Sequence, residues 1–451
     1  MVGAGEPRAF THVGPGTPAT GWQARPEWTA GEPLSLAGVT RLVVVAAHPD
    51  DESLGAGGLI ATATRLGLPV EIVCATDGEG SHPDSPTRTP EELALVRVHE
   101  GRLAAHELGA PDPHRLGLPD GSVADHHDDL TRRLVELVGD GRGEVIVAPW
   151  RHDGHPDHEA AGRAAAAAAR RTGADLWEYP VWFWHWGDPA DAPWSRLHPF
   201  GLDEHATHAK LAAIGAHASQ VAPLSDLEGD GILLSADLLA HFVDGPEHYL
   251  RTASVDAPDD SLDRLHEEEP DPWGVETRWY EQRKRDLLLA MLPRERFGHA
   301  LEVGSSTGAL AEALSGRSDR VLAVDRSPAA LASARARFQF EDHVTVLELD
   351  VPHEWPDDLV CDLVVVSEVG YFLSPAELDV LVQRIAGSLA PDGVLVLCHW
   401  RHRVEGWVLE AEDVHRRFED SGLPPVQATY RDQDVEIRVH APQTSWPDPT
   451  R

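Results

Sequence analysis

Two dense clusters of histidine and carboxylate side chains have the clearest capacity for chemistry in this chain. The first reads His48-Pro49-Asp50-Asp51-Glu52, and the second reads His152-Asp153-Gly154-His155-Pro156-Asp157-His158. Imidazole and carboxylate groups hold catalytic zinc ions while leaving one coordination position open for water. A single histidine in a loop is more often an ordinary polar residue. Two clusters of this density predict one metal centre built from two segments.

A glycine-containing turn marks a second place where chemistry is expected. The apolar run 300–303 leads into Gly304-Ser305-Ser306-Thr307-Gly308, and the next run, 321–324, ends at Asp325. Such a turn lets backbone amides approach a ligand, and a helix N-terminus favours negative charge. An acid after the second strand can accept both ribose hydroxyls. This order predicts a nucleoside cofactor site, while the Gly-x-Gly-x-x-Gly fingerprint of nicotinamide dehydrogenases is absent.

The elements that must position the two histidine clusters alternate between strands and helices. Apolar runs at 41–45, 69–74 and 144–147 predict strands, and the segment 89–108 and the alanine-rich stretch after Glu159 predict helices. Such alternation predicts a mainly parallel sheet. Because ligands bind at the carboxyl ends of the strands in an open α/β sheet, we expect the two clusters to meet there.

A second series of strands follows an acidic, proline-rich stretch, 256–271, that is typical of a solvated linker. Its candidate strands are 300–303, 321–324, 344–349, 363–366 and 394–398. The predicted fold class is α/β, with two doubly wound Rossmann-like domains. We expect a disordered leader at 1–35, a first domain at 36–253, the acidic linker at 254–272 and a second domain at 273–445.

The composition excludes several classes of protein. A formal net charge of -37 would repel nucleic acid, whose binding proteins gain affinity by releasing counterions to Lys and Arg. No apolar run approaches the roughly 20 residues that a membrane helix requires, and no secretory signal is visible. Cys74, Cys361 and Cys398 lie in separate predicted strands, which excludes a disulfide scaffold. We expect a cytoplasmic protein that binds neither nucleic acid nor membranes.

The first domain resembles the LmbE/PIG-L family of zinc N-deacetylases, whose His-Pro-Asp-Asp-Glu and His-Pro-Asp-His motifs are both intact here. The resemblance implies that the metal ligands are His48, Asp51 and His158. It implies that Asp50 is the general base, that His155 is the electrophile that stabilises the oxyanion, and that Asp157 orients the site. His152 is interpreted as a loop residue, or as one that contacts the metal ligands without binding the metal itself. Iron is an alternative to zinc with such ligands.

The same resemblance extends to the substrate. Arg97, with Glu100, and Asp120 match positions that contact the sugar in this family, although a surface salt bridge is an alternative for Arg97. The aromatic stretch 182–186 could either stack on a sugar ring or pack in the core. The implied partner is a small N-acetylated amino sugar or an aminoglycoside-like metabolite.

The second domain resembles the class I S-adenosylmethionine-dependent methyltransferases, and within them the group of nodulation N-methyltransferases that act on chitooligosaccharides. The resemblance implies that the methionine side of S-adenosylmethionine contacts Glu302, Gly304, Ser306 and Gly308. It places Asp325 at the ribose, Asp350 with Val351 at the adenine, and Glu368 facing the transferred methyl group. Ser306 departs from the glycine that many members have in the middle of this loop.

The base for methyl transfer is less well specified. Glu368, Tyr371 and the cluster His399-Trp400-Arg401-His402 lie near predicted strand ends and are candidates, with a structural role as the alternative.

As a whole, the sequence predicts a bifunctional enzyme that hydrolyses an N-acetyl group with a zinc-activated water and then methylates the exposed amine. Three alternatives stay open. Only one domain could be catalytic while the other binds or regulates, the two domains could act on unrelated substrates, or the methyl acceptor could be a hydroxyl.

Overall fold

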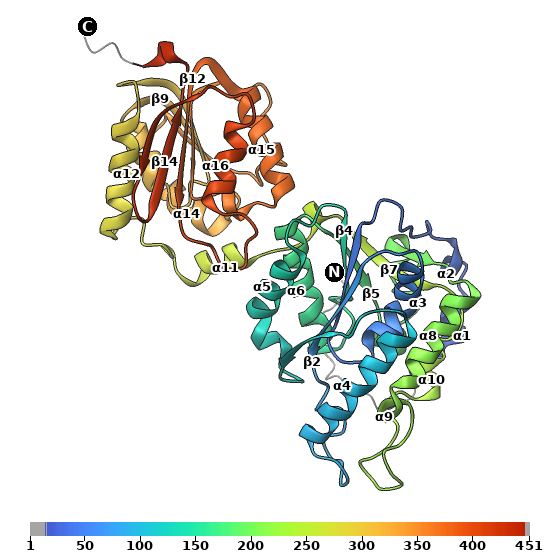
Figure 1. Cartoon of the computed structure of the whole chain (residues 1–451). Helices are drawn as coiled ribbons and strands as arrows, with labels where there is room; N and C mark the ends of the chain where they lie inside the picture. Colours follow the sequence, from blue (N-terminus) through green and yellow to red (C-terminus); the bar gives the residue numbers. More distant parts are fainter. Residues whose placement is uncertain (1–13, 15, 447–451) are drawn as a thin grey trace. The chain divides into compact units, whose positions relative to one another are not determined.

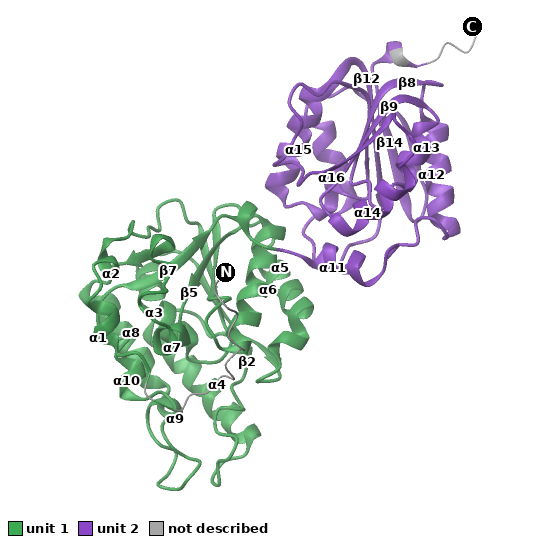
Figure 2. Cartoon of the chain, turned by 180° about the vertical axis from the view of Figure 1, so that it is seen from behind, with its two compact units in different colours: residues 1–258 green, residues 259–451 purple. Residues whose placement is uncertain are grey.

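The chain forms two compact units, residues 1–258 and residues 259–451, coloured separately in Figure 2. The structure is a computed structural model that describes residue 14 and residues 16–446. Each unit contains one seven-stranded sheet, so the predicted α/β class with two domains is confirmed. Among the described residues, no helix combines the length and the apolar character that a membrane span requires.

The sheet of the first unit has the strand order β3-β2-β1-β4-β5-β7-β6. Its strands are β1 Arg41–Ala46, β2 Val70–Thr76, β3 His114–Leu118, β4 Glu144–Pro149, β5 Asp175–Tyr179, β6 Leu197–Phe200 and β7 Glu247–Thr252. The strands from β3 to β5 run parallel, while β7 is antiparallel to both of its neighbours. The parallel part was expected, and the antiparallel edge was not.

The helices of the first unit cover both faces of this sheet. They are α1 Ala19–Gln23, α2 Glu27–Ala30, α3 Asp51–Arg65, α4 Pro90–Glu107, α5 His127–Val138, α6 Pro156–Thr172, α7 Trp182–Trp186, α8 Glu204–Ala216, α9 Ala218–Val221 and α10 Ala236–Leu239, with single 3-10 turns at η1 Val123–His126, η2 Trp194–Arg196 and η3 Ser254–Asp256. Helices α3, α4 and α8 lie on one face, and α5 and α6 lie on the other (Figure 1). Helix α4 begins where the sequence predicts, because Thr89 and Glu92 form a capping box.

The strand order places a topological switch point between β1 and β4. The chain leaves β1 toward α3 on one face and leaves β4 toward α6 on the other, so a crevice opens between the two carboxyl ends. Both histidine clusters follow these two strands. The tertiary fold therefore brings them to the same point, as the sequence predicts.

The predicted disordered leader is wrong for the residues from 16 onward, while residues 1–13 and 15 lie outside the described residues. Helices α1 and α2 bring Trp22 and Trp28 against Trp184 of α7, with ring centroids 4.9 and 5.4 Å from it. Trp22 is fully buried, and its Nε1 donates to the backbone oxygen of Trp184 at 2.8 Å. The Gly- and Pro-rich composition concealed these two anchors. The same contacts assign Trp184 to core packing rather than to a sugar-binding wall.

We expect Trp22→Ala to lower the free energy of unfolding of the first unit by about 3–5 kcal/mol, because it leaves a cavity and an unpaired carbonyl in a packed aromatic cluster. Denaturant unfolding followed by fluorescence measures this loss. Leu95→Ala is the matched control, since Leu95 is 72% exposed on α4 of the same unit. Equal stability of the two variants would contradict a structural role for α1.

The sheet of the second unit repeats the pattern with the order β10-β9-β8-β11-β12-β14-β13. Its strands are β8 Phe297–Val303, β9 Ser318–Asp325, β10 Val344–Glu348, β11 Cys361–Ser367, β12 Leu389–Trp400, β13 Val426–Arg431 and β14 Val435–His440. The parallel strands cover all five predicted ones. Here the switch point lies between β8 and β11, and β14 is antiparallel to β12 and β13.

The helices of the second unit are α11 Ser261–Glu268, α12 Trp279–Met291, α13 Ala309–Ser315, α14 Pro328–Arg337, α15 Pro375–Ser388 and α16 Ala411–Glu419, with 3-10 turns at η4 Gly370–Phe372 and η5 Gln443–Ser445. One apolar cluster joins α12 and α13 to the sheet, and a second joins α15 and α16 to its other face.

The predicted linker at 254–272 is wrong for most of its length. Helix α11 lies within this segment and packs against α14 in the second unit. His266 of α11 is buried, with its ring centroid 5.0 Å from that of Trp273. The acidic residues of the segment gave it the composition of a linker, although the helix has an inward-facing side.

Candidate functional site

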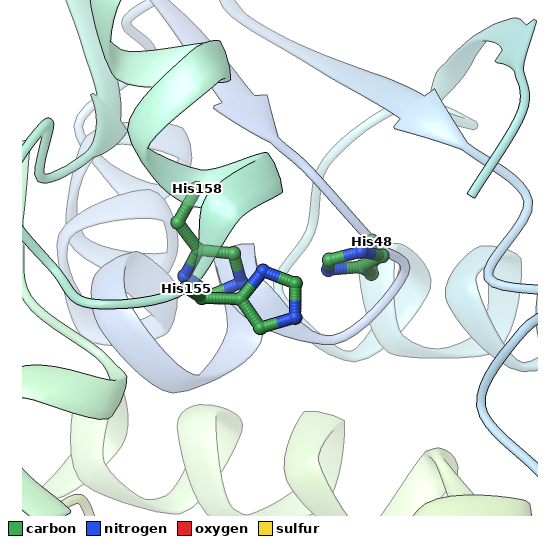
Figure 3. Close-up of side chains that lie close together, drawn as sticks. All are labelled: His48, His155 and His158. Carbon is green, nitrogen blue, oxygen red and sulfur yellow. The ribbon is translucent and has the colours of Figure 1, made fainter. Parts of the chain in front are cut away.

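Three imidazoles converge at the switch point of the first unit. His48 follows β1, His155 is the N-cap of α6, and His158 lies in the first turn of that helix. Figure 3 shows the imidazole of His48 facing those of His155 and His158, and one nitrogen from each ring lies within 4.8 Å of the others. His48 and His158 are buried, and His155 is partly buried. The two sequence clusters thus form a single site.

Carboxylates surround His48. Its Nε2 lies 3.1 Å from Asp120 Oδ1 and 3.3 Å from Asp157 Oδ2, and these three residues form a second group that could hold a metal ion. Asp157 accepts hydrogen bonds from the backbone nitrogens of Gly121 and Val123, which fixes its carboxylate beneath the site. Asp120, predicted to contact a sugar, therefore lies at the histidine cluster itself.

Asp51 lies between the imidazoles of His48 and His158, the two residues predicted to bind the metal together with it. Its Oδ1 lies 3.1 Å from His158 Nε2, and its Oδ2 lies 3.5 Å from His48 Nδ1. The structure therefore brings His48, Asp51 and His158 together. Their assignment as the ligand set stays a prediction, because His155, Asp120 and Asp157 offer donor atoms at similar distances.

Asp153, which the sequence analysis did not single out, orients His158. Its Oδ2 lies 2.7 Å from His158 Nδ1, and its carboxylate also accepts hydrogen bonds from the backbone nitrogens of Val181, Trp182 and Phe183. A carboxylate held by three N–H groups keeps the proton on Nδ1 and turns the lone pair of Nε2 toward the site. The only signal in the sequence was its position in the same loop as His155.

The residues present fit a divalent cation. His158 Nε2 is fully buried and makes no hydrogen bond to any described residue, although Asp51 lies close to it. An unpaired buried nitrogen is costly unless something else binds it. Neutral imidazoles and carboxylates that meet in one crevice are the donor set that zinc or iron accepts.

We expect Asp153→Asn to weaken metal binding by about 10- to 100-fold, because the amide keeps the shape of the side chain but cannot hold the imidazole proton as a carboxylate does. Competitive titration with a chromogenic zinc chelator measures the affinity. His152→Ala is the control, since the side chain of His152 is exposed and lies outside the cluster. If both variants bound metal equally well, Asp153 would have no role in orienting the ligand.

Asp50 lies beside the cluster in an uncommon backbone conformation, with φ at +148°. Its Oδ2 is 3.0 Å from a guanidinium nitrogen of Arg97, and only 5% of the residue is exposed. Burial raises the pKa of Asp50 to about 6, and the charge of Arg97 limits this rise. A non-glycine residue held at positive φ is often found at functional sites, where the surrounding structure maintains the strain.

Arg97 lies behind Asp50 rather than open to a ligand. It is 3% exposed and donates hydrogen bonds to the backbone oxygens of Gly78 and Pro49. Glu100, one turn further along α4, accepts hydrogen bonds from the backbone nitrogen and hydroxyl of Ser219. Sugar contact by Arg97 stays a prediction that this packing does not favour. The surface salt bridge considered for Arg97 is wrong, since the side chain is buried.

His155 can act as a hydrogen-bond donor without being protonated twice. Its Nδ1 accepts the backbone N–H of Asp157 at 3.2 Å, so the neutral ring carries its proton on Nε2. Burial and the neighbouring imidazoles of His158 and His48 hold the pKa of His155 well below its usual range. The ring thus offers an N–H donor beside the other two imidazoles.

In the second unit, the turn after β8 is held in the conformation that its glycines require. Gly304, Ser306 and Gly308 have φ angles of +75°, +47° and +84°. The backbone nitrogen of Ser306 donates to Asp325 Oδ2 at 2.8 Å, and that of Ser327 donates to Asp325 Oδ1 at 3.0 Å. Serine therefore adopts the left-handed backbone that glycine usually provides at this position.

Polar atoms around this turn are buried without partners. The Oγ atoms of Ser305 and Ser306, the Oγ1 of Thr307 and the Oε2 of Glu302 make no hydrogen bond to any described residue. Buried polar atoms are normally satisfied, and three hydroxyls and one carboxylate oxygen around one glycine turn fit a polar ligand. Asp350 and Val351 lie just after β10, whose last residue pairs with Asp325 in the sheet. The predicted cofactor residues thus lie along the carboxyl ends of β8, β9 and β10 in the second sheet.

The candidate bases for methyl transfer separate into two groups. Glu368 follows β11, and the hydroxyl of Tyr371 donates to its Oε2. His399 is fully buried behind them and binds the backbone nitrogen of Gly370. His402 is instead paired with Asp434 near the surface. Glu368 and Tyr371 are thus brought together beside the turn, with the ring of His399 packed 5.4 Å from that of Tyr371.

Comparison with known proteins gives matches to both units. Residues 43–169 match the PIG-L family model, described as GlcNAc-PI de-N-acetylase, and residues 256–422 match the model of nodulation protein S (NodS). The first part is similar to 1D-myo-inositol 2-acetamido-2-deoxy-alpha-D-glucopyranoside deacetylases. The protein from Streptomyces avermitilis is 31% identical over 42% of this chain and 72% of its own length, and that from Mycobacterium sp. (strain KMS) is 29% identical over 51% and 89%. Nodulation protein S of Sinorhizobium fredii is 32% identical over 28% of this chain and 59% of its own length.

Proposed function

The chain belongs to the PIG-L family through its first unit and carries a NodS-like methyltransferase domain in its second, and from this premise we propose that it deacetylates an N-acetylated amino sugar and then methylates the exposed amine. The observation that carries this proposal is chemical. A deacetylase generates a free amine, and an amine is the nucleophile that a methyltransferase of this group requires.

The residues of the first unit support hydrolysis of an acetamide. His48, Asp51 and His158 would hold a zinc ion, which lowers the pKa of a coordinated water to about 7 when it is bound. Asp50 is placed to receive a proton from the attacking water, because its carboxylate lies at the rim of the cluster and Arg97 fixes its position.

The tetrahedral intermediate of amide hydrolysis carries a negative oxygen that needs a hydrogen-bond donor. The Nε2–H of His155 supplies this donor, since its Nδ1 is engaged by the backbone of Asp157. When the carbon–nitrogen bond breaks, Asp50 returns its proton to the departing nitrogen, and acetate and a free amine remain. No residue of the second unit is needed for this reaction.

The second unit would bind S-adenosylmethionine at the turn after β8. Asp325 would hold the ribose, the unpaired hydroxyls of Ser305 to Thr307 would receive the methionine part, and Asp350 with Val351 would lie by the adenine. Methyl transfer is an in-line displacement in which positioning and exclusion of water supply most of the rate. Glu368 lies beside this turn, where the acceptor nitrogen must approach.

The order of the two reactions follows from the electronic structure of the substrate. The lone pair of an acetamide nitrogen is delocalised into the carbonyl group, so it is a poor nucleophile, whereas the deacetylated nitrogen can attack a methyl group once it has lost a proton. Because both units belong to one chain, the amine is released at a raised effective concentration near the second site.

Mass spectrometry tests the proposal. The full chain is incubated with zinc, S-adenosylmethionine and a panel of N-acetyl amino sugars that includes N-acetylglucosamine and its inositol glycoside. We expect loss of acetyl followed by gain of methyl on the same nitrogen. A product that is methylated while still acetylated would contradict the order, and would assign the methyl group to a hydroxyl.

A further inference from the structure

A buried lysine on α12 lies against the carboxylate at the end of β11. Lys284 Nζ donates to Glu368 Oε1 at 2.7 Å and lies 2.8 Å from Glu281 Oε2. Its side chain is only 8% exposed, and a buried lysine is rare unless it is paired. Two carboxylates share this one ammonium group, so the cluster carries a net negative charge when both are ionised.

Glu368 is held by donors from three different elements. Besides Lys284, the hydroxyl of Tyr371 and the backbone nitrogen of Trp400 both donate to its Oε2, the latter at 2.9 Å. A carboxylate has about four lone-pair sites, so these three donors leave room for one more. The side chain is 24% exposed, and its backbone has a positive φ of 59°. The carboxylate is thus fixed but still accessible.

The same carboxylate lies beside the predicted cofactor turn. Strands β8 and β11 are neighbours, with Val303 opposite Val366. Val369, which follows Glu368, packs so closely on Gly304 that a Cβ atom there would lie 2.0 Å from its Cγ2. Glu368 therefore lies next to the turn that would hold the methyl donor.

A second polar atom of α12 belongs to this cluster. The ring of Tyr280 lies 5.3 Å from Lys284 Nζ, and its hydroxyl is buried without a hydrogen-bond partner among the described residues. A buried, unpaired hydroxyl beside an accessible carboxylate is a suitable pair for a ligand that both donates and accepts hydrogen bonds.

We propose that Lys284 is a positioning residue for amine methylation, which fixes Glu368 as an ionised carboxylate whose remaining lone pair accepts an N–H of a protonated primary amine. This inference rests on the proposed function and narrows the acceptor of the second unit to a cationic amine. A net negative cluster attracts an ammonium ion, and an acetamide or a hydroxyl has no charge to match it.

The proton and electron balance of the step is simple. Glu368 takes one proton from the ammonium group, and the nitrogen lone pair then forms a bond to the methyl carbon of S-adenosylmethionine. The carbon–sulfur bond breaks with its electron pair staying on sulfur, and the methylated nitrogen carries the positive charge that sulfur carried before. Glu368 releases its proton to solvent.

Among the residues that the structure describes around Glu368, only Lys284 provides a positive charge. The titratable groups that face it from α12, η4 and β12 are Tyr280, Glu281, Lys284, Tyr371, Cys398 and His399. Burial lowers the pKa of His399 to about 4, so this ring stays neutral. Burial by itself would raise the pKa of Glu368, but the charge of Lys284, together with the hydrogen bonds that Lys284 and Tyr371 donate, lowers this pKa.

The test uses the full chain with Lys284→Met, Lys284→Arg and Arg283→Met. Arg283 is the matched control, because it is a cation on the same helix that pairs with Asp432 instead. Calorimetry first measures the affinity for S-adenosylhomocysteine, and then the binding of D-glucosamine and N-acetyl-D-glucosamine to that complex. Steady-state methylation of glucosamine is followed from pH 5 to pH 10.

We expect Lys284→Met to bind S-adenosylhomocysteine normally and to bind glucosamine about tenfold more weakly, because a charge-assisted hydrogen bond is lost or misdirected. Without the ammonium group the pKa of Glu368 rises, so the acid limb of the kcat/KM profile moves to higher pH. Lys284→Arg keeps most of the wild-type glucosamine affinity and most of the wild-type pH profile. Arg283→Met changes neither property. N-acetylglucosamine binds weakly to every variant.

The proposal would be overturned if Lys284→Met bound glucosamine as tightly as Arg283→Met does and had the same pH profile. Glu368→Gln keeps the shape of the side chain without its charge and gives a second route. It should weaken glucosamine binding as much as Lys284→Met does, and the double variant should be no worse than either. If the losses of glucosamine affinity in the two single variants added up in the double variant, the two residues would act independently and the proposal would also be overturned. If instead the wild-type chain methylates a hydroxyl and binds no amine, the proposed function itself fails.

Discussion

The Asp50→Asn variant will keep its metal and its fold but lose deacetylation by a factor on the order of 10²–10⁴, the usual contribution of a general base. Asparagine has the shape of aspartate, so it fits the same buried space beside Arg97. What it lacks is the capacity to receive a proton from water. Metal content by mass spectrometry and acetate release measure the two properties separately.

The same variant tests the order of the two reactions. We expect no methylation of the N-acetyl substrate, whereas the chemically deacetylated compound is methylated at the wild-type rate. Asp112→Asn is the matched control, because Asp112 is an exposed acid of the first unit that pairs with Arg102. Loss of metal in Asp50→Asn would make Asp50 a ligand rather than a base.

Asp325→Ala will show the opposite pattern, with loss of methylation and accumulation of the free amine. If the carboxylate accepts both ribose hydroxyls, it contributes two charged hydrogen bonds of about 1.5–3 kcal/mol each. Their loss corresponds to a weakening of S-adenosylhomocysteine binding by a factor on the order of 10²–10⁴. The turn after β8 loosens as well, since Asp325 also binds the backbone nitrogen of Ser306.

Calorimetry measures the affinity of Asp325→Ala for S-adenosylhomocysteine, and the rate of acetate release measures its deacetylase activity. Asp319→Ala is the control, because Asp319 lies on the same strand but is exposed and pairs with Arg296. Deacetylation should be unchanged in both variants, since each unit has its own sheet and its own apolar clusters. Cofactor affinity that survives in Asp325→Ala would remove Asp325 from the ribose site.

Both sites lie where the strand order reverses, which explains why their residues could be predicted from sequence. A ligand at a switch point is bound by the loops that directly follow strands. His48, Gly304 and Asp325 each follow an apolar run within two residues, so the pattern of the chain points to them. The residues that orient these groups carry no such signal.

Asp153 and Lys284 show what local patterns do not reveal. Asp153 binds the N-terminus of α7 through three backbone nitrogens, and this contact exists only after β4 and β5 have paired. Lys284 reaches Glu368 from a helix that lies far earlier in the sequence. In both cases the partner is chosen by packing between elements, which no spacing in the sequence encodes.

The predictions of a disordered leader and an acidic linker were wrong for a related reason. The leader and the linker were assigned by composition, but Trp22 and His266 are each buried by contact with another segment. One large side chain in a favourable cavity can anchor a short helix whose average composition is that of a solvated chain, because the free energy comes from the buried area and not from the mean hydropathy.

By itself, the sequence determined the two α/β domains, the two clusters of histidine and carboxylate, and the glycine turn with its acid, because strand periodicity and residue spacing are local properties. Only the tertiary structure decided that Arg97 lies behind Asp50, that Asp153 orients His158, and that Lys284 holds Glu368. These are contacts across the sheet and between helices. They depend on which side chains share a buried space, and that is fixed only when the whole unit has packed.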